Sequence, residues 1–166
     1  MEKINWIKDL VLAEQQMEDS GMVDMSIGFD PETELEEATT EFLSELKAAF
    51  VEISSSFNQL KSSTVGTIKI YGISKTRADF MLFRNGYKLI FSMKQPGIIN
   101  VNFNATAPVF VPGQTASDIQ PTSPVDTLKA RWGAYGELSW TSNDLPINLD
   151  FLVRYYVSRF VRESAK

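Results

Sequence analysis

A run of apolar residues at helical spacing between residues 31 and 61 constrains this chain more than any other feature. Its members recur three, four or seven positions apart, as on one face of an α-helix: Leu35, Phe42, Leu46, Ala49, Ile53, Phe57 and Leu60, with Leu43 and Phe50 widening the stripe. Asp30 is a good N-cap, and Pro31 suits the first helical position. Such a helix is roughly 46 Å long, so its apolar face must meet a sheet or a partner.

The strongest local signal after this helix is Asn85-Gly86, which lies between apolar runs at 79–84 and 87–92. Asn-Gly favours a two-residue hairpin turn, because both residues accept the positive φ angles that this turn requires. In the resulting register, two pairs of large apolar side chains lie opposite each other on one face of the sheet. These pairs are Leu82 with Leu89 and Phe80 with Phe91, and we expect Met93 on the same face.

Other segments also have the alternating pattern of strands. Strand-like patterns occur at 65–74 and 99–105, and residues 127–141 indicate one bent strand or two short ones. A C-terminal helix over about 146–163 follows, with Asn143 or Asp144 as its cap. The predicted fold class is α+β, with a mainly antiparallel sheet of about five strands packed with the helix over about 31–61 and the C-terminal helix.

The N-terminal part of the chain differs from the rest in charge. Residues 1–45 contain thirteen Asp or Glu and two Lys, whereas residues 46–166 contain eight acids and fourteen Lys or Arg, which sums to a net charge of -5. A short amphipathic helix that ends within 15–21 and a strand-like segment at 23–29 precede the long helix. We therefore expect an acidic segment, 1–30, before a single domain, 31–166, with a Pro-, Ser- and Thr-rich loop at 107–124.

The acidic residues have two interpretations. Those at the start of the long helix are stabilised by the helix dipole and by water: Asp30, Glu32, Glu34, Glu36, Glu37, Glu41 and Glu45. The alternative is a docking face for a basic partner. The acids before the helix have no dipole to account for them, and they are Glu2, Asp9, Glu14, Glu18, Asp19 and Asp24. The basic end of the C-terminal helix is the first candidate for what they meet.

The chain has neither histidine nor cysteine, which excludes many kinds of chemistry. Catalytic triads with histidine, thiolate nucleophiles, disulfides and His or Cys zinc sites all need one of these side chains. No phosphate-binding glycine motif and no calcium-loop motif occurs either, so we expect no cofactor and no metal. Catalysis through carboxylates or lysine stays open as a weaker third hypothesis.

The distribution of apolar and basic residues also bears on location. No apolar run is long enough to span a membrane, and the N-terminus lacks the pattern of a secretory signal. Lys and Arg do not cluster before the last helix, which disfavours nucleic-acid binding. We expect a cytoplasmic protein that neither inserts into membranes nor binds nucleic acid.

The C-terminal helix is the main candidate for a binding surface. Its apolar residues surround the helix axis, and a helix that is apolar all round is buried on more than one side. Either the sheet or the N-terminal helix covers its outer side, or a partner does. The candidate partner contacts in this helix are Tyr155, Tyr156, Phe160, Arg159 and Arg162.

Two other segments contain candidate contacts. In the proline-rich loop, Val109, Phe110 and Val111 form a short apolar stretch that either becomes an edge strand or inserts into a partner. In the strand region after the loop, three aromatic residues are either core residues or a platform for a small ligand or carbohydrate: Trp132, Tyr135 and Trp140.

Together these features predict a non-enzymatic protein-binding or assembly module of the adaptor, scaffold or chaperone kind. It is expected to act through the C-terminal helix and the acidic N-terminal region, on a protein partner or on a second copy of itself. The alternative is a small-ligand or carbohydrate-binding domain in which a sheet grips a helix, with Trp132 and Trp140 near the mouth of the site.

Overall fold

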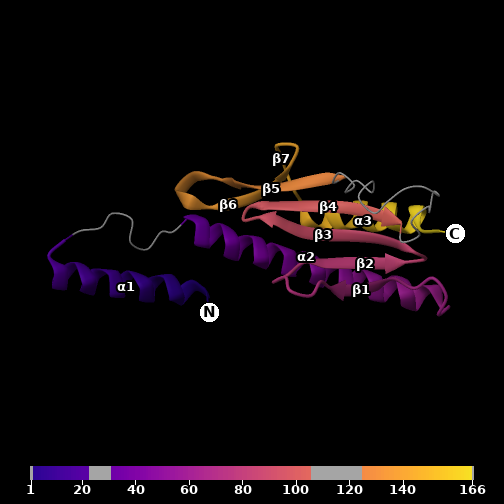
Figure 1. The fold of residues 1–166 in the computed structure, drawn as a ribbon, viewed down its shortest axis with the longest axis horizontal. Helices are drawn as coiled ribbons and strands as arrows, with labels where there is room; N and C mark the ends of the chain where they lie inside the picture. Colours follow the sequence, from indigo (N-terminus) through magenta and orange to yellow (C-terminus); the bar gives the residue numbers. More distant parts are fainter. Residues whose placement is uncertain (1, 23–30, 106–124, 166) are drawn as a thin grey trace, which may run out of the picture. The chain divides into compact units, whose positions relative to one another are not determined.

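The computed structural model describes residues 2–22, 31–105 and 125–165 (Figure 1). They belong to two compact units, Met1–Leu35 and Glu36–Lys166. The first unit contains α1 (Glu2–Ser20) and the start of α2 (Pro31–Lys61). The second contains the rest of α2, a seven-stranded sheet, the short 3₁₀ helix η2 (Ala134–Gly136) and α3 (Leu149–Glu163).

The first helix ends at Ser20, within the segment 15–21 in which its end was predicted. α1 continues through residues 15–20, because Gln15, Gln16 and Glu18 are good helix formers even without an apolar stripe. It is terminated by Gly21, which has a φ of 69° and whose N–H donates to the carbonyl of Met17. The strand predicted at 23–29 lies outside the described residues. So does the loop predicted at 107–124, with Val109, Phe110 and Val111.

The sheet is an antiparallel meander in which neighbouring strands follow the order of the chain. Its strands are β1 (Lys69–Gly72), β2 (Phe80–Arg84), β3 (Tyr87–Gln95), β4 (Ile98–Ala105), β5 (Asp126–Trp132), β6 (Leu138–Ser142) and β7 (Leu145–Pro146). The α+β class is confirmed, although the described ranges contain a sheet of seven strands rather than about five. The segment predicted at 127–141 is two strands, β5 and β6, which are joined by the turn that contains η2.

The hairpin between β2 and β3 has the predicted register. Asn85 and Gly86 have φ angles of 50° and 83°, as a two-residue turn of this type requires. Two apolar pairs are therefore aligned, and all four of their side chains are fully buried: Phe80 with Phe91, and Leu82 with Leu89. The face of the sheet that they share is called the inner face below.

Both α2 and α3 pack against the inner face. The ring of Phe91 lies 5.1 Å from that of Phe50 in α2 and 5.6 Å from that of Tyr156 in α3. The core that they form with the sheet includes Leu43, Leu46, Ile99, Val101, Leu128, Leu152, Val153 and Phe160. The unit therefore has two layers, one of strands and one of helices.

The start of α3 differs from the prediction by three residues. Its N-cap is Asn148, whose side-chain oxygen accepts hydrogen bonds from the N–H groups of Asp150 and Phe151. Asn143 and Asp144, which were predicted as caps, instead have φ angles of 52° and 64° between β6 and β7. Their turn brings β7 back against β6, so the chain cannot enter the helix until β7 has ended.

The other end of α3 is held by the hairpin between β2 and β3. The buried guanidinium of Arg84 donates from Nη1 to the carbonyl of Val161 and to Oγ of Ser164, each at 3.0 Å. The side-chain amide of Asn85 donates to the carbonyl of Ser164 at 2.8 Å. Cationic and N–H donors suit this position, because the last carbonyls of a helix lack partners within the helix.

Candidate functional site

The two sides of α3 differ in exposure. Leu152, Val153, Tyr156 and Phe160 are buried against the sheet. The structure thus places two of the predicted partner contacts, Tyr156 and Phe160, in the core of their own chain. On the opposite side, the side chains of Phe151 and Tyr155 are 67% and 55% exposed. One of the sequence-based alternatives required the sheet to cover the outer side of α3 as well. The exposure of Phe151 and Tyr155 shows that the sheet does not.

The exposed side of α3 presents two aromatic rings and two arginines. Its members fall at i, i+3, i+4, i+7 and i+11, so they form one line along the helix. We call this line the aromatic–arginine strip, and it consists of Phe151, Arg154, Tyr155, Ser158 and Arg162. All five side chains are exposed in the described part of the chain.

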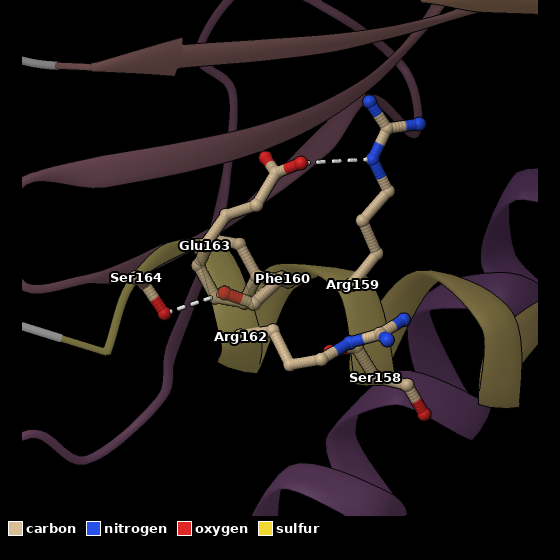
Figure 2. Close-up of polar contacts among 6 residues, drawn as sticks. All are labelled: Ser158, Arg159, Phe160, Arg162, Glu163 and Ser164. Carbon is tan, nitrogen blue, oxygen red and sulfur yellow. Dashed lines mark hydrogen bonds and ion pairs between the residues drawn. The ribbon is translucent and has the colours of Figure 1, made fainter.

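Contacts within the strip hold its two arginines along the helix. The guanidinium of Arg154 lies 5.8 Å from the centre of the Phe151 ring. Nε of Arg162 donates to the carbonyl of Ser158 at 3.2 Å, and Figure 2 shows this side chain extending back along α3. The strip therefore offers apolar rings and positive charge together, which is a frequent composition of binding hot spots.

Arg159, also predicted as a partner contact, lies beside the strip and is already engaged. Its Nε forms a 3.1 Å ion pair with Oε1 of Glu163 (Figure 2), and its guanidinium lies 4.8 Å from the centre of the Phe103 ring. The hydrogen bond to Glu163 raises the pKa of Arg159 above its ordinary value. A partner would have to compete with Glu163 for this guanidinium, so Arg154 and Arg162 are better placed for contacts.

The three aromatic residues proposed as a ligand platform differ in their exposure. Trp140 stacks on Phe42 of α2, with ring centroids 4.6 Å apart and planes inclined by 9°. Trp132 is 37% exposed, and Tyr135 is fully exposed in the turn between β5 and β6. Trp140 thus packs at the margin of the core, while the other two face solvent.

A polar cluster fixes the orientation of α3 on the sheet. The carboxylate of Asp126 accepts hydrogen bonds from the hydroxyls of Tyr156 and Ser142 and from the N–H of Thr127. Burial, followed by the hydrogen bond to Asp126, raises the pKa of the Tyr156 hydroxyl. These partners suit a structural role for the cluster. Among the described residues, no group of three or more acidic side chains is placed to hold a metal ion.

The sequence-based interpretation named Tyr155 and Arg162 but missed Phe151 and Arg154. A signal was present, because Phe151 lies four residues before Tyr155 and Arg154 lies eight residues before Arg162. It was hidden by apolar residues on all sides of the helix, which leave the direction of the sheet undefined. No helix in the described ranges is long and apolar enough to cross a membrane.

No protein-family model, curated protein or solved structure matches this chain. Its function is therefore inferred from the chemistry and exposure of these surfaces.

Proposed function

We propose that this chain is a non-enzymatic protein-binding or assembly module that holds its partner through the aromatic–arginine strip of α3. The exposure of Phe151 and Tyr155 carries this proposal. Burying a large apolar side chain contributes roughly 2 kcal/mol, so a partner that covers both rings gains substantially. The acidic N-terminal region is proposed as a second contact, because its charge attracts a basic partner over longer distances.

The anchoring of α3 supports this proposal. Asn148 caps its first turn, Tyr156 bonds to Asp126 at its middle, and Arg84 binds its last turn. Because the helix is held at three points, the side chains of the strip need little rearrangement before a partner binds. A partner then loses less free energy to ordering than it would on a mobile loop.

Co-purification tests the proposal. We expect the tagged full-length chain to retain a partner from its native cells, and the double variant Phe151→Asp with Tyr155→Asp to lose it. The matched control is Leu60→Asp with Tyr135→Asp, which adds the same two charges at exposed apolar positions outside the strip. Thermal unfolding establishes that both variants are folded. Equal retention by the two double variants would contradict the proposal.

The exposure of Trp132 and Tyr135 favours a second candidate, the binding of a small ligand or carbohydrate at the turn between β5 and β6. Tryptophan fluorescence during titration with a ligand panel tests it. A ligand that changes the emission of the natural chain but not that of Trp132→Phe would support this candidate. An unchanged emission throughout the panel would count against it.

A further inference from the structure

We infer that the strip's partner is a second copy of this chain, and that the strip packs on the exposed side of α2 in that copy. The inference rests on the proposed function, because it assigns the partner of the same strip. It is carried by the pattern of charge and apolar surface on α2.

The exposed side of α2 has two glutamates with apolar surface between them. Glu45 and Glu52 are exposed, and so are Ala48 and Val51, with Val51 46% exposed. We call these four residues the acidic ridge. The residues buried under the helix are Leu43, Leu46, Phe50 and Ser54, so the ridge points away from the sheet.

The ridge and the strip have matching spacings and opposite charges. Glu45 and Glu52 are seven residues apart, and Arg154 and Arg162 are eight apart. Both separations are about two helical turns, or roughly 11 Å. Between the charges, the ridge has the small Ala48 and the short Val51, while the strip has the large ring of Tyr155. Laid along each other, the two helices bring opposite charges together over a shared apolar centre.

The arrangement of the two helices allows both copies to make this contact at once. Each helix faces the sheet with its buried side, so the ridge and the strip lie on the same outer surface of the helical layer. Both helices also run in the same direction. Trp140 of β6 contacts Phe42, in the first half of α2, and the backbone of Ile147, just before α3. Toward the other ends of the helices, Asn58 of α2 bonds to Ile68 before β1, and Ser164 after α3 bonds to Arg84 of β2.

A two-fold axis between the helices and parallel to them therefore places the ridge of each copy over the strip of the other. This is an isologous interface, the commonest kind in oligomers, and it closes as a dimer because each copy uses the same surface. It buries the rings of Phe151 and Tyr155 twice, once from each copy. The second copy of the chain thus supplies the acidic ridge that the strip binds.

Sedimentation velocity of the full-length chain at increasing concentration tests the inference. We expect a dimer at low salt that is weakened at about 1 M salt, where charges are screened beyond about 3 Å. Arg154→Glu with Arg162→Glu should weaken the dimer by roughly tenfold or more, and so should Glu45→Arg with Glu52→Arg. The variant with all four changes should recover it, since both sides of the interface are then reversed. Recovery cannot come from misfolding.

The matched control reverses Lys69 and Lys129 to Glu. Both lysines are exposed. Their chain neighbours Ile70 and Leu128 point to the inner face, where they pack in or against the core, so Lys69 and Lys129 lie on the face of the sheet away from the helices. This variant should dimerise like the natural chain. A chain that is monomeric at every concentration, or a four-fold variant that fails to recover the dimer, would overturn the inference. The proposed function would survive that result if the co-purification experiment still showed that Phe151→Asp with Tyr155→Asp loses a partner. The partner of the strip would then be a different protein.

Discussion

The hydroxyl of Tyr156 donates a 2.6 Å hydrogen bond to Oδ2 of Asp126, joining the middle of α3 to the first residue of β5. This bond helps to decide which side of α3 faces the sheet. With Tyr156 turned inward, Phe151 and Tyr155 lie on the other side of the helix and face solvent. The composition of the exposed strip is therefore a consequence of a contact made in the core.

The raised pKa of Tyr156 predicts a pH dependence of stability. Below about pH 10 the hydroxyl is protonated in both the folded and the unfolded chain, so its stabilising contribution is fully present. Above about pH 10 the unfolded chain loses this proton while the folded chain keeps it. The free energy of unfolding should then fall by up to about 1.4 kcal/mol per pH unit through this residue.

Urea unfolding of the natural chain and of Tyr156→Phe at about pH 9 and about pH 11 checks this expectation. The variant should be less stable at the lower pH, because it lacks the bond to Asp126. The difference between the two proteins should narrow at the higher pH. A difference that stays constant over this range would show that Tyr156 ionises equally in both states.

Arg84 should be among the most sensitive polar positions in the fold. Its buried guanidinium donates to the carbonyls of Gly66 and Val161 and lies 5.4 Å from the centre of the Phe57 ring. Arg84→Met removes a charged donor from the part-buried carbonyl of Val161 and from the buried hydroxyl of Ser164, so we expect a loss of about 3 kcal/mol in the free energy of unfolding. Chemical denaturation measures it.

The matched control for that experiment is Arg77→Met. Arg77 forms a 2.6 Å ion pair with Glu36, but the two side chains are 62% and 44% exposed. Exposed pairs contribute at most about 1 kcal/mol, so this variant should be nearly as stable as the natural chain. Similar losses for the two variants would contradict the role assigned to burial.

The turn between β2 and β3 gives a backbone prediction. Gly86 has a φ of 83°, in the left-handed region, where a Cβ atom is unfavourable. Gly86→Ala should therefore reduce the free energy of unfolding by about 1 to 2 kcal/mol. Thermal or urea unfolding measures the loss, and an unchanged stability would mean that the turn can change its type without cost.

Local signals account for the parts of the fold that could be predicted. The bounds of α2 followed from Pro31 and an uninterrupted apolar stripe, and the register of β2 and β3 followed from Asn85-Gly86. β7 is only two residues long, which is too short for any periodicity. It forms because Asn143 and Asp144 adopt positive φ angles, and a sequence alone does not distinguish such a turn from a helix cap.

The proposed binding surface could be predicted only in part, for a physical reason. Apolar residues surround α3, so its sequence does not define the side that the sheet covers. Contacts with residues distant in sequence, Asp126 and Arg84, set this direction. Tyr156 and Phe160 therefore became core residues, whereas Phe151 and Arg154 joined the exposed strip.

Site-specific photo-crosslinking tests most directly whether the aromatic–arginine strip is a binding surface. A photoreactive phenylalanine analogue replaces Tyr155 in the full-length chain, and the native cells are irradiated. The control positions are Tyr135 and Tyr71, which are also exposed aromatic residues but lie outside the strip. We predict a discrete protein adduct from position 155 and none from positions 135 and 71. No adduct from position 155, or equal adducts from all three positions, would contradict the account.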